Sequence, residues 1–236
     1  MREEISLSAS VVGIGLQTFY SIQHIQSAAY HARRAGRLES RYGGSLTSPV
    51  LTAIKAEVGS ALFAAVAFLE ATANELFADA AVPGGGHLHS LSSDRLQVIS
   101  TLGAIEAVDR SQVIPKFEIL LSGAGAESVP RGGSIAQAVT QLVALRNGLT
   151  HYKAGWFDVG SEGMTRPGSW SSSNLGRGLQ NKFLRRKHAS PSEADAWIGY
   201  GCARWATSSA LRYTDEVFSR LKVKPIYDHV RGNLRF

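Results

Sequence analysis

A cluster of polar side chains in the middle of the chain has the residue types needed to cleave a phosphodiester. Arg146, Asn147 and His151 lie within six residues, at the end of an apolar run with helical spacing. The guanidinium of arginine is a permanent cation whose planar fork suits phosphate. The imidazole of histidine gives or takes a proton near neutral pH. The cluster therefore offers a charge for an anionic group and a group for proton transfer.

The spacing of these residues indicates how they can share one site. Asn147 and His151 are four residues apart and so lie on one face of a helix. Arg146 and His151 are five residues apart, roughly 140° around the helix axis. They are thus expected to flank one site rather than to grip the same small group, which suits a site completed by a second subunit. The structural alternative is a polar helix end, where Arg and His oppose the helix dipole.

A second polar group interrupts an apolar helical segment upstream. Glu70 and Asn74 are four residues apart and share a helix face. We expect Glu70 to pair with Arg146, and both side chains to orient Arg146 or His151. The alternative is a solvated polar edge of the helix. Tyr152, directly after the cluster, is taken as a further supporting residue.

Charge is unevenly distributed along the chain, whose formal net charge is +6. Residues 1–176 hold 13 Lys and Arg against 14 Asp and Glu, a net of −1, whereas residues 177–236 hold 12 against 5, a net of +7. This basic region favours an anionic partner, with nucleic acid first, although a solvated basic surface has the same composition. The RNA-binding candidates in it are Lys182, Arg185, Arg186 and Lys187, with Trp156 and Trp170 upstream as possible stacking platforms for bases.

Several classes of site are excluded or disfavoured. Cys202 is the only cysteine, so the chain has no internal disulfide and no cysteine-based zinc site, and Cys202 is expected in the core. His87 and His89 lie in a glycine-rich loop without neighbouring cysteines or paired carboxylates, so no metal site is predicted. No cofactor is predicted either.

The start of the chain and its apolar stretches favour a cytoplasmic protein. Residues 1–4 are acidic on balance, where a signal peptide would be basic. Glu70 and Glu75 interrupt the longest apolar stretch, so no membrane span is expected. Glu75 is expected on the surface.

The hydrophobic pattern predicts one mostly helical domain over residues 1–236. Residues 5–16 read as a short strand or an extended arm, and glycines are expected to end the first helix at Gly36 or at residues 43–44. Residues 123–133 and 154–180 read as loops. Helices are predicted at residues 18–34, 47–81, 92–108, 111–122, 134–151 and from about 191 to 221.

The order of these elements and the Arg-Asn cluster resemble the HEPN domain family (higher eukaryotes and prokaryotes nucleotide-binding). In that family a helix ends in Arg, four to six residues and then His, and a polar residue, often Asn, comes directly after the Arg. Residues 145–152 (Leu-Arg-Asn-Gly-Leu-Thr-His-Tyr) follow this pattern. Residues 68–77 resemble the long upstream HEPN helix, and residues 202–218 the closing helix.

The resemblance implies an all-α, up-and-down helical bundle that forms a homodimer. It covers a core of about residues 47–222 and leaves an N-terminal arm and helix (1–45) and a long insertion before the last helix (154–190) unassigned. The implied function is a metal-independent endoribonuclease, acting as a toxin or phage-defence effector with a possible antitoxin partner. The alternative is a non-catalytic HEPN-like module that binds RNA, a nucleotide or a protein.

Overall fold

The computed structural model describes residues 19–151, 158–160, 163–165, 179, 182–183 and 198–235. The expectations for residues 5–16, Tyr152, Trp156, Trp170 and 185–187 lie outside these residues.

The protein is all-α apart from one short antiparallel hairpin. Its elements are α1 (Tyr20–Tyr42), α2 (Ser48–Ala81), η1 (Gly86–Leu88), α3 (Ser93–Gly103), α4 (Glu106–Asp109), α5 (Val113–Gly123), α6 (Ser134–Thr150), β1 (Asp158–Gly160), β2 (Gly163–Thr165), α8 (Tyr200–Leu221) and η2 (Asp228–Leu234).

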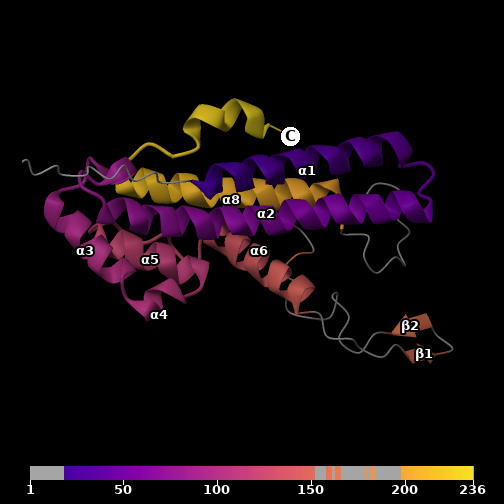
Figure 1. Ribbon diagram of the computed structural model, residues 1–236. Coiled ribbons are helices and arrows are strands. Elements are labelled where there is room, and N and C mark those ends of the chain that lie inside the picture. Colours follow the sequence, from indigo (N-terminus) through magenta and orange to yellow (C-terminus); the bar gives the residue numbers. More distant parts are fainter. Residues whose placement is uncertain are drawn as a thin grey trace, which may run out of the picture.

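Helix α2 is the centre of the bundle. It packs along α1 and α8 on one side, whereas α3, α5 and α6 contact it on another (Figure 1). The predicted start of this helix, with Pro49 in its first turn, and its predicted end before Pro83 are confirmed. The apolar positions of all these helices meet in one hydrophobic cluster. Its largest fully buried side chains include Phe68, Phe117, Tyr213, Phe218 and Tyr227.

Helix α1 belongs to this core and is longer than predicted. Ile25, Ala28 and Ala32 are fully buried, and the helix continues through Gly36 to Tyr42. A Cβ at Gly36 would lie 3.0 Å from the ring of Tyr200, so this glycine allows α8 to approach. Gly36 therefore serves packing between helices, and the prediction that it ends α1 is wrong.

Two other predicted helix boundaries are also wrong. The helix predicted at 92–108 is divided, because Ile105 has an extended backbone (φ −78°, ψ 119°) between α3 and α4. The last helix begins at Tyr200 rather than near residue 191. Gly199 before it is extended (φ −148°, ψ −175°), and the Tyr200 N–H donates to Oε1 of Glu39 at 2.5 Å. Its end at Leu221 was predicted correctly.

By length and composition alone, α2 qualifies as a membrane span. It has 34 residues, and its most apolar window has a mean hydropathy of 1.6 with 33% of that window buried. Glu70 and Glu75 thus do not interrupt the apolar stretch enough for α2 to fail this test. A core helix of a soluble protein passes the same test, and the buried side of α2 also carries Thr72, Glu75 and Asp79. The length and composition of α2 are therefore weak evidence for a span.

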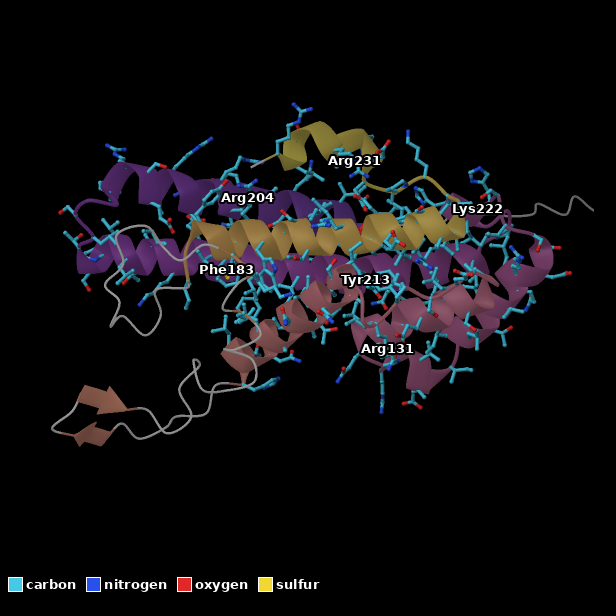
Figure 2. The ribbon with its side chains drawn as sticks, turned by 180° about the vertical axis from the view of Figure 1, so that it is seen from behind. Arg131, Phe183, Arg204, Tyr213, Lys222 and Arg231 are labelled. Atoms are coloured by element: carbon cyan, nitrogen blue, oxygen red, sulfur yellow. The ribbon has the colours of Figure 1, made fainter. Side chains whose placement is uncertain are left out.

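The segment after α8 folds back over the bundle, which the sequence did not predict. Tyr227 is fully buried, and its hydroxyl donates to Oδ1 of Asp215 at 2.7 Å and hydrogen-bonds Oγ1 of Thr214 at 2.7 Å. Arg231, labelled on η2 in Figure 2, donates to both carboxylate oxygens of Asp215 at 2.7 and 3.1 Å. These polar contacts satisfy the buried tyrosine and fix the C-terminal segment on α8.

Candidate functional site

The Arg-Asn-His cluster lies at the C-terminal end of α6, as predicted. The apolar stripe of this helix buries Val139, Leu142 and Leu145 against the bundle. Gly148 remains inside the helix, and His151 follows as its cap, with its N–H donating to the carbonyl of Asn147 at 2.8 Å. The His151 side chain is exposed. An exposed imidazole at a helix end is accessible to a ligand.

Arg146 and Glu70 form an ion pair that joins α6 to α2. Nη2 of Arg146 donates to Oε1 of Glu70 at 2.6 Å. The side chains of Arg146 and Glu70 are 26% and 46% exposed, so the pair lies at the surface of the bundle. The predicted contact between these two residues is confirmed.

The guanidinium of Arg146 is only partly satisfied by this pair. Its Nε is buried and has no hydrogen-bond partner within the described part of the chain. A buried N–H without a hydrogen-bond partner lowers the stability of the folded protein, and a ligand or a water molecule can satisfy it. Arg146 therefore has donor capacity beyond its bond to Glu70.

Asn74 has a different partner from the one predicted. Its Oδ1 accepts a hydrogen bond from Nζ of Lys116 at 2.8 Å, so the prediction that Asn74 orients Arg146 or His151 is wrong. Lys116 on α5 is 7% exposed and binds Asn74 because a buried ammonium needs an acceptor. The spacing of apolar residues around Lys116 indicates that it is buried. Lys116 is three residues after Val113 and four before Leu120, on the buried face of a helix.

Glu70 and Asn74 thus place two cations along one side of α2. Arg146 reaches α2 from α6, and Lys116 reaches it one helical turn further along, from α5. Both cations contact an oxygen of α2 rather than a free anion. The side of α2 that faces α5 and α6 therefore carries two cations, each paired with a polar oxygen of α2.

The structure describes fewer contacts for the other predicted site residues. Asn147 is half-buried, and no hydrogen bond joins its side chain to His151 within the described residues. Lys182 is half-buried, whereas Arg185, Arg186, Lys187 and Tyr152 lie outside the residues that the structure describes.

Glu75 is buried, contrary to the prediction of a surface position. It is 8% exposed, and its Oε1 accepts from the backbone N–H of Ser21 at 2.8 Å. Ser21 lies in the first turn of α1, where backbone N–H groups lack partners within the helix. A carboxylate there also complements the positive end of the helix dipole. Glu75 therefore caps α1 from the neighbouring α2.

The described residues contain neither a cluster of metal ligands nor an exposed thiol. No group of three or more His, Cys, Asp or Glu side chains among them is arranged to hold a metal ion. Cys202 is fully buried, as predicted, and burial raises the pKa of its thiol. A thiol held in that state is a poor nucleophile.

In comparisons with protein-family models, curated proteins and solved structures, nothing matches this chain.

Proposed function

We propose that the protein is a metal-independent endoribonuclease of the HEPN-like kind, acting as a homodimer. The observation that supports this most is the end of α6. There, the half-buried Arg146 donates from Nη2 to Glu70, and its Nε has no partner among the described residues. The exposed His151 follows at the end of the same helix. One group can bind a phosphate and the other can transfer a proton.

The proposed reaction uses the 2′-hydroxyl of RNA as its nucleophile. A histidine removes the proton from that hydroxyl as its oxygen attacks phosphorus, and a second acid protonates the departing 5′-oxygen. Arg146 stabilises the negative charge that develops on the phosphorane oxygens. The products are a 2′,3′-cyclic phosphate and a 5′-hydroxyl, and no metal takes part.

A second subunit supplies the second histidine that the reaction needs. Arg146 and His151 are five residues apart, which separates them around the helix axis. A two-fold axis next to the end of α6 brings the His151 residues of two chains to one cleft, so that one acts as base and the other as acid. Action in the cytoplasm as a toxin or phage-defence effector, held by an antitoxin partner, follows from the family resemblance.

Cleavage of labelled RNA in the presence of EDTA tests this proposal. The native protein is expected to cut RNA to products with 2′,3′-cyclic phosphate ends and to leave DNA of the same sequence intact. His151→Ala is expected to lower the rate by about 100- to 10,000-fold, and Arg146→Lys to fail because a point charge does not replace a planar fork. His24→Ala, which removes an imidazole from α1, serves as the matched control and is expected to cut normally.

DNA cleavage, or cleavage that requires a divalent ion, would contradict the mechanism.

The second candidate function is a non-catalytic module that binds RNA, a nucleotide or a protein. The pairing of Arg146 with Glu70 favours it, because a carboxylate at 2.6 Å opposes a phosphate at the same guanidinium. RNA binding without cleavage of any RNA tested, with or without metal, would identify this second function.

A further inference from the structure

A pocket lies at the other end of the bundle from the N-terminus of α2. It is a cavity of about 740 Å³ between η1, the C-terminal end of α2 and the segment that follows α8. Figure 2 shows Lys222 at the end of α8, where this segment begins. The side chains of Glu70, Arg146 and His151 do not line the pocket, so it is separate from the site proposed for RNA.

One wall of the pocket holds a histidine bonded to a buried carboxylate. Asp79 is 1% exposed, and its Oδ2 lies 3.0 Å from Nδ1 of His87 and 3.3 Å from the His87 backbone nitrogen. Because an ionised carboxylate only accepts hydrogen bonds, this contact places a proton on Nδ1 of His87. The imidazole is thereby held in one orientation, and its Nε2 is the nitrogen remote from Asp79. The His87 side chain remains 38% exposed.

The glycines before His87 shape the loop around this carboxylate. Gly84, Gly85 and Gly86 have φ values of +81°, +75° and +51°, a region that favours glycine. A Cβ at Gly86 would lie 2.4 Å from Oδ1 of Asp79. Both the backbone conformation and the space therefore require glycine at Gly86. The loop folds tightly over Asp79 and presents His87 to the pocket.

The facing wall carries a lysine with an unusual backbone. Lys222 has a φ of 58°, the one left-handed residue other than glycine in the described part of the chain. It ends α8, with the Val223 N–H bonded to the carbonyl of Phe218, a position that glycine usually occupies. Lysine there costs backbone strain and places an exposed ammonium on the pocket wall.

The side chains that line the pocket include two lysines, two aspartates and three histidines beside an apolar wall. Asp228 is already paired with Lys224 at 3.2 Å and with Arg231 at 2.9 Å. The ring of Phe19 packs edge-on to His87, with centroids 5.0 Å apart. Basic or imidazole side chains on the rim are Lys222, Lys224, His87, His89 and His229, and apolar ones are Phe19, Val223, Pro225 and Ile226.

We propose that this pocket binds a small phosphorylated molecule of nucleotide size. Its phosphate lies between the Lys222 ammonium and Nε2 of His87, and its apolar part lies against Phe19 and Ile226. Lys222 donates to the phosphate from its ammonium. His87 donates from Nε2 as an imidazolium, which is protonated on both ring nitrogens while its Nδ1–H donates to Asp79. The cavity has the size of known small-molecule sites, which are about 300–1,000 Å³.

Calorimetric titration of the full chain with adenosine 5′-monophosphate, and with adenosine as the uncharged probe, tests this site. AMP is expected to bind with 1:1 stoichiometry and adenosine at least about tenfold more weakly, because charge-assisted hydrogen bonds to the phosphate are lost. Inorganic phosphate is expected to compete with AMP. Absence of AMP binding, or equal binding of adenosine, would overturn the proposal.

Two variants assign the phosphate to this pocket rather than to other basic surface. Lys222→Gly removes the ammonium yet suits the left-handed backbone, so thermal stability is expected to be kept or raised while AMP binding weakens about tenfold or more. His87→Asn keeps a donor for Asp79 and removes Nε2, with a similar loss expected. Arg110→Gln, at the exposed C-cap that follows α4, is the charge-matched control. Undiminished AMP binding by both pocket variants would overturn the assignment, whatever the outcome for RNA cleavage.

Discussion

Nη2 of Arg146 lies 2.6 Å from Oε1 of Glu70, so the basic residue of the Arg-Asn-His cluster is held by a carboxylate from α2, 76 residues earlier in the sequence. The contact fixes the guanidinium relative to the central helix and offsets its charge. A phosphate that approaches Arg146 must therefore share the guanidinium with Glu70 or displace it. If the proposed function holds, this carboxylate is expected to weaken the attraction between Arg146 and RNA.

Glu70→Gln is expected to tighten RNA binding by about threefold to tenfold at low salt, since it keeps an acceptor for Arg146 and removes the negative charge. Fluorescence anisotropy with a labelled 2′-O-methyl RNA, which resists cleavage, measures the dissociation constant. The gain should shrink as salt rises, because exposed charges are screened. Glu106→Gln on the surface of α4 is the matched control. Weaker binding by Glu70→Gln would mean that the carboxylate positions Arg146 rather than competes with RNA.

Glu75→Ala is expected to lower the free energy of unfolding by about 1–3 kcal/mol, because it leaves the buried Ser21 N–H without its charged acceptor. Urea unfolding followed by circular dichroism measures the change. Glu127→Ala is the control, since that side chain is 96% exposed and is expected to change stability by less than about 0.5 kcal/mol. Equal effects of the two variants would contradict the capping role of Glu75.

The sequence predicts contacts well where two polar residues interrupt apolar helical faces. Glu70 and Arg146 each lie in an otherwise apolar run, and pairing between them lowers the cost of placing both near the core. The helix boundaries with strong local signals, Pro49 at a start and Pro83 beyond an end, were also predicted correctly. Local chemistry alone accounts for the two helix boundaries.

Other contacts with distant elements are predicted poorly, because the local pattern of the residue indicates a different role. Glu75 looks like a surface residue until α1 places its Ser21 N–H beside it, and Gly36 looks like a helix end until the Tyr200 ring packs on it. The spacing of Asn74 from Glu70 predicts a role beside Arg146, but the buried ammonium of Lys116 on α5 is the group that binds Asn74. In each case tertiary packing outweighs the local preference of the residue.

The loop before α6 is expected to make stability depend on acid pH. Arg131 donates to both carboxylate oxygens of Glu118 at 2.6 and 2.7 Å, and these bonds lower the pKa of Glu118 from its ordinary value of 4.5. A carboxylate with a lowered pKa stabilises the folded state above its unfolded pKa and loses that contribution as pH falls through the folded value.

Chemical unfolding of the native protein and Glu118→Gln from pH 7 to pH 3 checks this. The native protein is expected to be the more stable at pH 7, and the difference is expected to shrink as pH falls below about 4.5. A difference that stays constant over this range would show that the charge of Glu118 does not contribute. High salt should reduce the difference at pH 7, since Arg131 is largely exposed.

Mixing native chains with His151→Ala chains tests whether two subunits share one site. The proposed cleft needs the His151 of both chains, one as base and one as acid. After subunit exchange of equal amounts, about a quarter of the dimers are native, about half are mixed and about a quarter carry two substituted chains. If the site is shared, mixed dimers are expected to cut RNA at least about 100-fold more slowly, so the mixture is expected to keep roughly a quarter of the rate of the same amount of native protein.

A rate near half of the native value, although native mass spectrometry detects the mixed dimer, would mean that each chain works with its own His151. Native protein mixed with His24→Ala under the same exchange conditions controls for activity lost through the treatment alone.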